Sequence, residues 1–264
     1  MDLQINGKTA LVTGSTAGIG FAIAAELARE GAVVTINGRS QAGVDAALGR
    51  LREQVPGARV SGVAADLATA AGCAELFAAC PRAEIVVNNL GIFDPAPFEA
   101  IADSEWQRFF DTNVMSGVRV ARHYLPAMKA ANWGRIVFIS SESGINTPGE
   151  MVHYGMTKSA QLAVSRGLAQ SCAGTGVTVN AVLPGPTRSE GVTDFFGKLA
   201  ADAGIAVDEM ERRFFAEGRP TSILKRMIAP AEVAALVAYV CSARASATTG
   251  AALRVEGGVV STMC

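Results

Sequence analysis

The stretch Thr9-Ala10-Leu11-Val12-Thr13-Gly14-Ser15-Thr16-Ala17-Gly18-Ile19-Gly20 decides the fold. A short apolar run leads directly into a glycine-rich turn, and helical spacing begins immediately after it. Such a turn lets the backbone approach a pyrophosphate, and it points free N–H groups and the positive end of the helix dipole at that anion. The spacing GxxxGxG differs from the GxGxxG dinucleotide motif, so the turn could also serve tight packing alone.

Strand and helix patterns alternate on both sides of this turn. Apolar, β-branched runs predict strands at 9–13, 32–36, 59–64, 85–88, 135–140, 177–182 and 253–255. Helical spacing predicts helices at 19–30, 41–54, 69–79, 104–129, 154–172 and 230–242. Uniformly apolar strands separated by helices indicate a single α/β domain over 1–264 with a doubly wound parallel sheet. A long insertion at 186–220, after the sixth strand, breaks the rhythm and is typical of a substrate lid.

Composition limits the class of partner. The chain has 264 residues, of which 50% are hydrophobic and 18% charged, and its formal net charge is -1. Its 23 lysines and arginines are scattered, so neither nucleic acid nor an anionic membrane is expected to bind, and a small molecule is the expected partner. With no long apolar segment or basic leader, the chain is expected to be cytoplasmic.

The cysteines support neither a disulfide framework nor a metal site. There are five of them, with no CxxC pair and no neighbouring histidine cluster: Cys73, Cys80, Cys172, Cys241 and Cys264. We expect buried or idle thiols, and no metal.

The end of the second strand bears on the choice of nucleotide. About 20 residues beyond the glycines, an acidic side chain would bond a ribose 2′-hydroxyl and select NAD. Gly38 and Arg39 stand there instead. A guanidinium suits a 2′-phosphate, which favours NADP(H) and leaves NAD(H) possible, although Arg39 could also be an ordinary surface arginine.

Tyr154 and Lys158 lie four residues apart at the start of a helical segment, so they share one face of it. A nearby ammonium favours the phenolate and lowers the pKa of a tyrosine, which would make Tyr154 useful as an acid and base. Ser141 comes thirteen residues before Tyr154, at the end of an apolar strand, where open parallel sheets bind their ligands.

Together these motifs resemble the compact branch of the short-chain dehydrogenase/reductase family. The residues that carry the resemblance are the stretch 13–20, Asn88-Asn89-Leu90-Gly91, Asn113, Ser141, Tyr154-Gly155-Met156-Thr157-Lys158 and Pro184-Gly185. The resemblance implies a single NAD(P)-binding Rossmann-type domain with a seven-stranded parallel sheet. It also implies a homotetramer, built through two long central helices, or a homodimer.

The resemblance further implies a role for each catalytic residue. Tyr154 would be the general acid and base, Lys158 would bond the nicotinamide ribose and lower the pKa of Tyr154, and Ser141 would position the substrate oxygen. Asn113 would hold a water that links Lys158 to solvent, although it could instead cap or kink a long helix.

The cofactor contacts implied in the same way include Asp66 at the adenine and Thr187 at the nicotinamide amide. Asp66 could also serve as the N-cap of the next helix. His153, beside Tyr154, is interpreted as a surface or pocket-rim histidine. The full set of expected cofactor contacts is Gly14, Ser15, Thr16, Gly18, Ile19, Gly20, Arg39, Asp66, Leu67, Asn89, Gly91, Tyr154, Lys158, Pro184, Gly185 and Thr187.

The sequence therefore predicts an NADP(H)-dependent oxidoreductase that interconverts a carbonyl and a secondary alcohol. The substrate stays open among a 3-oxoacyl thioester, a sugar and an apolar ketone. The alternatives are an NAD-dependent alcohol dehydrogenase of the same family and a non-catalytic protein that senses the nucleotide.

Overall fold

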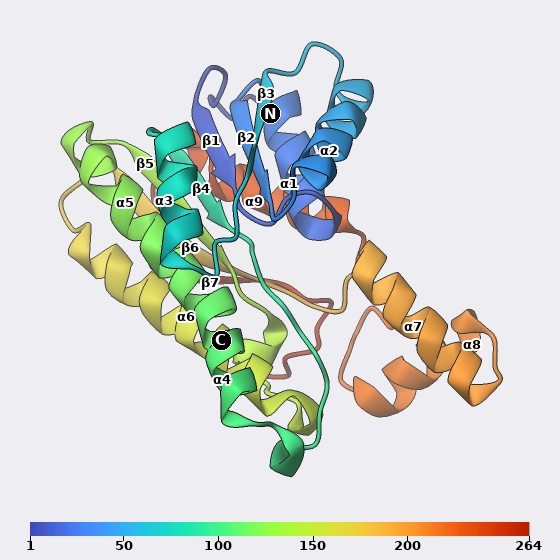
Figure 1. Cartoon of the computed structure of the whole chain (residues 1–264). Coiled ribbons are helices and arrows are strands. Elements are labelled where there is room, and N and C mark those ends of the chain that lie inside the picture. The colour runs from blue at the N-terminus through green and yellow to red at the C-terminus, as the bar shows by residue number, and fades with distance from the viewer. Residues whose placement is uncertain (264) are drawn as a thin grey trace.

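The computed structural model describes residues 1–263, so the predicted idle thiol of Cys264 lies outside the described residues. Seven parallel strands form one sheet in the order β3-β2-β1-β4-β5-β6-β7 (Figure 1). They are β1 (Thr9–Val12), β2 (Val33–Gly38), β3 (Val60–Ala64), β4 (Ile85–Asn88), β5 (Gly134–Ile139), β6 (Val177–Pro184) and β7 (Ala252–Val255). Every strand predicted from the sequence is present, with its ends within two residues of the predicted positions.

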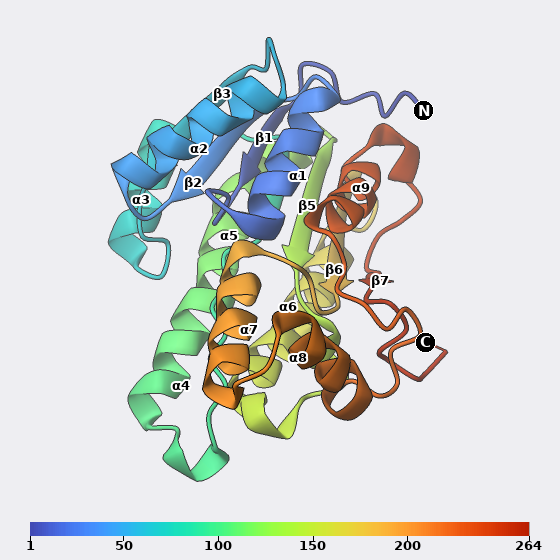
Figure 2. The same ribbon diagram turned by 90° about the vertical axis from the view of Figure 1, so that its right-hand side faces the viewer.

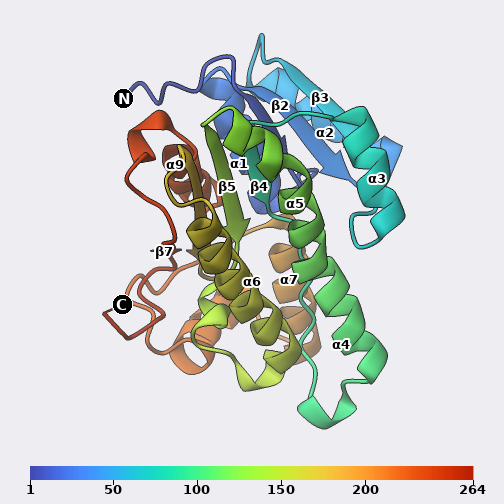
Figure 3. The same ribbon diagram turned by 90° about the vertical axis from the view of Figure 1, so that its left-hand side faces the viewer.

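Helices cover both faces of the sheet, which confirms the doubly wound architecture. One face carries α1 (Gly18–Arg29), α2 (Gln41–Gln54) and α9 (Pro230–Val240), as Figure 2 shows. The opposite face carries α3 (Ala70–Ala79), α5 (Ser116–Ala130) and α6 (Val152–Ser171), as Figure 3 shows. Neighbouring residues of a strand point to opposite faces, so Val12 packs into the first layer and Leu11 into the second.

The predicted helix at 104–129 is not continuous. It consists of α4 (Asp103–Phe110), the π-helical segment η2 (Asp111–Met115) and α5. The π-helical segment contains Asn113, whose side-chain amide hydrogen-bonds the backbone of Ile92 and the hydroxyl of Thr157. Single π-helical turns inside α-helices often mark functional sites, and hydrophobic spacing alone does not reveal them.

The 186–220 insertion contains two helices that the sequence reading left out, α7 (Glu190–Ala203) and α8 (Val207–Arg213), followed by the π-helical segment η5 (Phe214–Gly218). Ser189 caps α7 by accepting a hydrogen bond from the N–H of Val192, and Gly204 ends it with φ 66°. The insertion has its own small core around Phe196 and Phe215. In Figure 1, α7 and α8 lie to the right of α4 and α6.

Four short 3-10 helices complete the described elements: η1 (Phe98–Ala100), η3 (Glu142–Gly144), η4 (Gly149–Met151) and η6 (Ala243–Ala245). Within residues 1–263 we find no helix with the length and apolar character needed to cross a membrane. Cys73, Cys80, Cys172 and Cys241 are buried and free, which confirms the prediction for these four thiols.

The chain order of the strands reverses between β1 and β4. From β1 the chain moves outward to β3, then returns to β4 and moves outward in the other direction to β7. At such a switch point the loops after neighbouring strands diverge, which opens a crevice outside their carboxyl ends. The glycine-rich turn after β1 and the segment after β4 meet at this crevice.

Candidate active site

The turn after β1 leaves no space for side chains at its glycines. Gly14 and Gly18 have φ values of 59° and 57°, in the left-handed region that favours glycine. A Cβ on Gly20 would lie 2.5 Å from the carbonyl oxygen of Gly14 and would also meet the amide of Asn89. Glycine at these positions therefore allows the turn to pack closely against Leu90, Asn89 and Ser189.

Polar side chains hold this turn against the sheet. Ser15 Oγ donates to Val12 O at 2.6 Å and accepts from the N–H of Asn37 at 3.0 Å. Asn89 Nδ2 donates to the carbonyl oxygens of Thr13 and Gly14 at 3.1 and 2.9 Å. Ser15 and Asn89 thus shape the turn through contacts within the protein.

Sequence reasoning missed the structural role of Asn37. Its Oδ1 accepts a hydrogen bond from the N–H of Gly14 at 3.3 Å, and its Nδ2 donates to the carbonyl oxygens of Val63 and Ala65 at 3.1 Å each. A polar residue within an otherwise apolar strand was the available signal, because a buried amide requires partners.

A carboxylate from a distant part of the chain contacts the start of α1. Its N-cap is Ala17, which has no side-chain hydrogen bond to offer. Instead, the N–H of Gly18 donates to Glu190 Oε2, from the 186–220 insertion, at 2.7 Å. The other oxygen of Glu190 lies 3.7 Å from Arg50 Nη1. A carboxylate thus takes the place that suits a phosphate, and the uncapped helix start fits the anionic part of a dinucleotide.

The residues expected around the adenosine lie along the same edge of the sheet. A Cβ on Gly38 would lie 2.5 Å from Thr16 Cγ2, so a side chain at position 38 would require Thr16 to move. Arg39 is exposed, and its guanidinium has no hydrogen bond or ion pair with any residue in 1–263. It is free to meet an anionic ligand.

Asp66 and Leu67 follow β3, and the structure changes the interpretation of both. Asp66 is exposed and accepts a hydrogen bond from the N–H of Ala68, whereas Thr69 is the N-cap of α3, so the alternative of Asp66 as the N-cap is wrong. The side chain of Leu67 is buried in the core, which leaves only its backbone for a ligand. Core packing of this kind is set by tertiary contacts.

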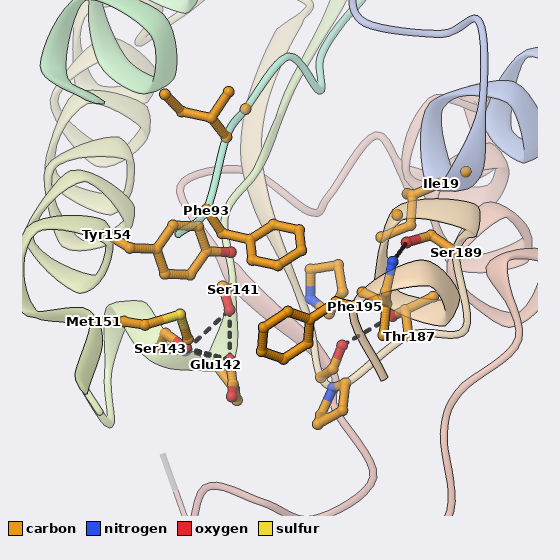
Figure 4. A pocket seen from close by; sticks show the side chains of 18 of the residues that line it. Ile19, Phe93, Ser141, Glu142, Ser143, Met151, Tyr154, Thr187, Ser189 and Phe195 are labelled. Carbon is orange, nitrogen blue, oxygen red and sulfur yellow. Dashed lines mark hydrogen bonds between the residues drawn. The ribbon is translucent and has the colours of Figure 1, made fainter. Parts of the chain in front are cut away.

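A cavity of about 530 Å³ lies between the sheet edge and the 186–220 insertion. Tyr154, at the start of α6, and Ser141, after β5, direct their hydroxyl groups into it (Figure 4). Lys158 lines the same cavity, one helical turn beyond Tyr154. The predicted cofactor residues that also line it are Gly18, Ile19, Gly20, Asn89, Gly91, Pro184, Gly185 and Thr187. Those that do not are Gly14, Ser15, Thr16, Arg39, Asp66 and Leu67, and the catalytic candidate Asn113 also lies outside the lining.

Lys158 is buried with few polar neighbours. Its Nζ donates to Ile139 O at 2.9 Å and lies 5.5 Å from the centre of the Tyr154 ring. Burial lowers the pKa of Lys158 to about 8, because the charged form loses its hydration, while the negative charge of Glu142 acts in the opposite direction.

The expectation of a lowered pKa for Tyr154 is not met. Burial raises the pKa of Tyr154 above its usual value, and the charge of Glu142 raises it further. The hydroxyl of Ser141 and the charge of Arg219 lower this pKa, but the first two effects prevail. The carboxylate of Glu142, which the spacing of Tyr154 and Lys158 does not reveal, opposes the expected effect of the Lys158 ammonium.

Glu142 and Arg219 are the functional candidates that sequence reasoning missed. The Ser141 hydroxyl donates to Glu142 Oε2 directly, as the dashed lines in Figure 4 show. Arg219, at the end of the 186–220 insertion, donates through Nε to Glu142 Oε1 at 3.2 Å. No sequence pattern pairs residues 77 positions apart, so this contact needed the tertiary structure.

Asn113 is buried beside the cavity rather than on its surface. Its Oδ1 accepts from the N–H of Ile92 at 2.8 Å, and its Nδ2 donates to Thr157 Oγ1 at 3.0 Å. A Cβ on Gly91 would lie 3.4 Å from Lys158 Nζ and 3.5 Å from Asn113 Oδ1. The amide of Asn113 and the ammonium of Lys158 therefore face the same small space above Gly91.

The segment after β6 brings Pro184, Gly185 and Thr187 to the cavity. A Cβ on Gly185 would lie 2.5 Å from Glu256 O, so this position also requires glycine. Thr187 is buried, and its hydroxyl donates to Gly185 O at 2.8 Å.

The interpretation of His153 as a surface or pocket-rim residue is wrong. His153 is buried, and its ring lies 4.0 Å from that of Phe109 and 6.0 Å from that of Trp106. Because α4 packs against the start of α6, the ring faces α4 and does not line the cavity.

Comparisons with known proteins agree with this architecture. The profile of the family described as short chain dehydrogenase matches residues 8–199. The uncharacterized oxidoreductase YvaG of Bacillus subtilis is 50% identical over 260 residues, covering 98% of this chain and 98% of YvaG. D-beta-hydroxybutyrate dehydrogenase of Cupriavidus necator is 33% identical, covering 97% and 99%. The crystal structure of L-sorbose reductase from Gluconobacter frateurii, complexed with NADPH and L-sorbose, has a TM-score of 0.93 at 31% identity and full coverage of both chains.

Proposed function

The chain belongs to the short-chain dehydrogenase/reductase family of NAD(P)-dependent oxidoreductases, and from this premise we propose that it interconverts a carbonyl and a secondary alcohol with NADP(H), using Tyr154, Ser141, Lys158 and Asn113. One observation carries the proposal. The hydroxyl groups of Tyr154 and Ser141 share a cavity with Lys158, and this cavity continues to the start of α1, where Gly18, Ile19 and Gly20 line it. A proton donor and a dinucleotide site thus meet at one edge of the sheet.

The cofactor would lie across the carboxyl ends of the strands. Gly14, Gly18 and Gly20 would hold the pyrophosphate, with Ser15, Thr16 and Ile19 of the same turn around it. Asp66, Leu67, Asn89 and Gly91 would contact the adenosine side, and Pro184, Gly185 and Thr187 the nicotinamide side. When bound, NADPH supplies the hydride for reduction of the carbonyl carbon.

Arg39 supports the choice of NADP(H) over NAD(H). It is the exposed cation next to Gly38, a position that carries no acidic side chain, and it has no partner within residues 1–263. A 2′-phosphate placed there would gain charge-assisted hydrogen bonds. L-sorbose reductase, which shares this fold, was crystallised with NADPH.

Tyr154 Oη would hold the proton that the carbonyl oxygen takes up in reduction, and would accept it in the reverse direction. The raised pKa of Tyr154 keeps the phenol protonated at neutral pH, which suits a general acid. Ser141 Oγ would position the same oxygen from the other side, since both hydroxyl groups point into one cavity (Figure 4). Its single proton, donated to Glu142 Oε2 in the structure, would turn to that oxygen when the substrate binds.

Lys158 and Asn113 would return a proton to Tyr154. Lys158 has a pKa of about 8, so its ammonium can release and regain a proton near neutral pH. Asn113 Oδ1 keeps a second lone pair beyond its bond with Ile92, and it faces the same space as Lys158 Nζ. A water in that space would link the two side chains.

The test is Tyr154→Phe, which removes one oxygen and leaves the ring in place. We expect NADPH binding, followed by nicotinamide fluorescence, to be retained, and turnover of carbonyl substrates to fall at least about a hundredfold. Tyr239→Phe, on a partly exposed tyrosine of α9, is the matched control. Full turnover in Tyr154→Phe would reject the assigned mechanism. Tight NADPH binding by the wild type without hydride transfer to a broad panel of ketones and alcohols would favour the nucleotide-sensing alternative.

We also propose a cytoplasmic homotetramer, or homodimer, that acts on a small molecule and binds neither nucleic acid nor membrane. The long helices α5 and α6 would form the subunit contacts, as the family resemblance implies. Light scattering of the purified protein tests the assembly, and a monomer mass at micromolar concentration would contradict it.

A further inference from the structure

The cavity contains a buried ion pair that the proposed chemistry does not use. Glu142, 4% exposed, and Arg219, 9% exposed, both line it. Most of the remaining wall near them is apolar, with Phe93, Phe195 and Phe214 among its residues. Replacing a buried ion pair by apolar side chains is often neutral or stabilising, so stability alone does not explain this pair.

The pair is fixed next to the expected position of the substrate oxygen. Glu142 Oε2 accepts hydrogen bonds from the hydroxyl groups of Ser141 and Ser143, the latter at 2.8 Å. Its Oε1 accepts from Arg219 Nε at 3.2 Å. Only one hydrogen-bonded side chain, Ser141, therefore separates Glu142 from the carbonyl that is to be reduced.

Arg219 retains unused donors. Its Nη1 donates to Gly218 O at 2.7 Å and lies 3.7 Å from Glu150 Oε1, and its guanidinium lies 5.4 Å from the centre of the Phe214 ring. Its Nη2 makes no hydrogen bond within the part of the chain that the structure describes. Glu142 and Arg219 both line the cavity and are hydrogen-bonded to each other, so a carboxylate acceptor and an unpaired N–H donor belong to one part of its wall.

A hydroxyl group matches this pair because it donates and accepts at once. A plain ketone would bury the Nη2 donors of Arg219 without a partner, which is costly. A carboxylate would face three carboxylates of the cavity lining, Glu142, Glu150 and Glu190. Only two cations of the same lining, Arg219 and Lys158, would balance them. Ser141 and Glu142 are hydrogen-bonded to each other, so a carbonyl oxygen held by Ser141 and a hydroxyl oxygen held by Glu142 would lie close together. This arrangement suits oxygens on neighbouring carbons of one substrate.

Resting on the proposed function, we infer that Glu142 and Arg219 determine the substrate class, and that the enzyme acts on neutral carbonyl compounds with a hydroxyl group on the carbon next to the carbonyl. The Glu142 carboxylate would accept the hydrogen of that hydroxyl, and Arg219 would donate to its oxygen. Because Arg219 comes from the 186–220 insertion, the selecting pair is complete only when the insertion covers the cavity.

Three substrates of one shape test the inference. All three compounds contain an ethyl group on the carbonyl carbon. The second substituent is hydroxymethyl in 1-hydroxybutan-2-one, ethyl in pentan-3-one and carboxylate in 2-oxobutanoate. We expect kcat/KM for the hydroxyketone to exceed that for pentan-3-one about ten- to hundredfold, since the plain ketone leaves buried donors unpaired. We expect 2-oxobutanoate to be the poorest of the three.

Variants of Glu142 and Arg219 test whether these two residues cause the preference for the hydroxyketone. Glu142→Gln should reduce the ratio of the hydroxyketone to pentan-3-one several-fold. If Glu142→Gln acted only by moving Ser141, kcat/KM would fall equally for both substrates and their ratio would not change. A changed ratio therefore shows that Glu142 recognises the hydroxyl group of the substrate. The double variant Glu142→Leu with Arg219→Met should abolish the preference without leaving an unpaired buried charge. Glu211→Gln, which removes the 2.8 Å ion pair with Arg188 in the same insertion, is the matched control and should keep the wild-type ratio.

NADPH binding and thermal unfolding confirm that each variant is folded before its ratio is read. A wild-type ratio near one, a ratio unchanged in the double variant, or a preference for 2-oxobutanoate would overturn the inference and leave the proposed function standing. NADPH binding without hydride transfer to any carbonyl would overturn the proposed function, and the inference with it.

Discussion

The glycine turn with α1 and the 186–220 insertion lie on opposite sides of one cavity, yet they are held in different ways. In α1, six of twelve residues are buried, whereas α7 buries two of fourteen and α8 none. Three hydrogen bonds fix the turn before α1. Ser15 Oγ donates to Val12 O of β1, the N–H of Gly14 donates to Asn37 Oδ1 of β2, and Asn89 Nδ2 donates to Gly14 O. The insertion has a small apolar cluster of its own.

This difference separates the tasks of the two regions. A site for a cofactor of constant shape benefits from a rigid support, and the sheet edge provides one. A site that selects among substrates is more readily varied where few core contacts depend on it. The insertion reaches the site through two charged side chains, Glu190 on the start of α1 and Arg219 on Glu142.

The largest expected effect contrasts one glycine from each region. A Cβ at Gly20 would lie 2.5 Å from Gly14 O, so Gly20→Ala should lower the free energy of unfolding by about 1 to 3 kcal/mol. Displacement of the turn should weaken NADPH binding about a hundredfold. Gly197, in α7, has nothing within 4 Å of a Cβ, and Gly197→Ala should stabilise the protein by about 0.5 to 1 kcal/mol. Calorimetry and fluorescence titration measure both, and equal effects would remove the contrast.

The next effect concerns the nucleotide alone. Arg39→Ala should raise the Kd of NADPH about ten- to hundredfold and leave that of NADH nearly unchanged, because only the 2′-phosphate loses its partner. Arg52→Ala, on an exposed arginine of α2, serves as control. Thermal shifts with each nucleotide at equal concentration report the difference. Equal shifts with both nucleotides in the wild type would reject the role of Arg39.

A smaller effect concerns the influence of the Glu142 charge on the pKa of Tyr154. Its negative charge raises the pKa of Tyr154, so Glu142→Gln should lower that pKa. In the proposed mechanism, alcohol oxidation needs deprotonated Tyr154 and its rate rises with pH, so the rising limb should move to lower pH in Glu142→Gln. Glu150→Gln, at the half-exposed rim, should move it less, since Glu150 does not shift the pKa of Tyr154. An unmoved limb in Glu142→Gln would contradict the assignment.

The smallest effect tests the contact between the two regions. Glu190 accepts a hydrogen bond from the N–H of Gly18, where the pyrophosphate of the cofactor would bind. Glu190→Gln removes a competing negative charge, and the Kd of NADPH should fall several-fold. Asp194→Asn, on an exposed aspartate of α7, is the control and should leave the Kd unchanged. Weaker NADPH binding in Glu190→Gln would show that the carboxylate helps the cofactor to bind.

Most of the sheet could be predicted because its signals are local. Apolar runs of four to eight residues and the spacing of Tyr154 and Lys158 are properties of short segments. The predicted helix at 104–129 was wrong at Asn113, where contacts with Ile92 and Thr157 accompany a π-helical segment. Those partners are distant in sequence, and periodicity does not include them.

The residue types of the candidate site could be predicted from the sequence, but the surroundings of these residues could not. Ser141, Tyr154 and Lys158 lie together at the cavity as expected, but the pKa of Tyr154 is raised rather than lowered. The cause is burial together with Glu142, which is held by Arg219 from across the cavity. His153, adjacent to Tyr154 in sequence, proved to be buried against α4.

The amino-acid sequence by itself determined the order of strands and helices, the glycines of the turn and the reactive side chains at the carboxyl ends of the strands. These depend on backbone conformation and on periodicity, which act over a few residues. Only the tertiary structure decided the half-buried position of Tyr154, the burial of Lys158, the charge beside Ser141 and the contacts of Glu190 and Arg219 across the cavity. Electrostatic and packing energies depend on distances between segments far apart in the chain, and folding sets those distances.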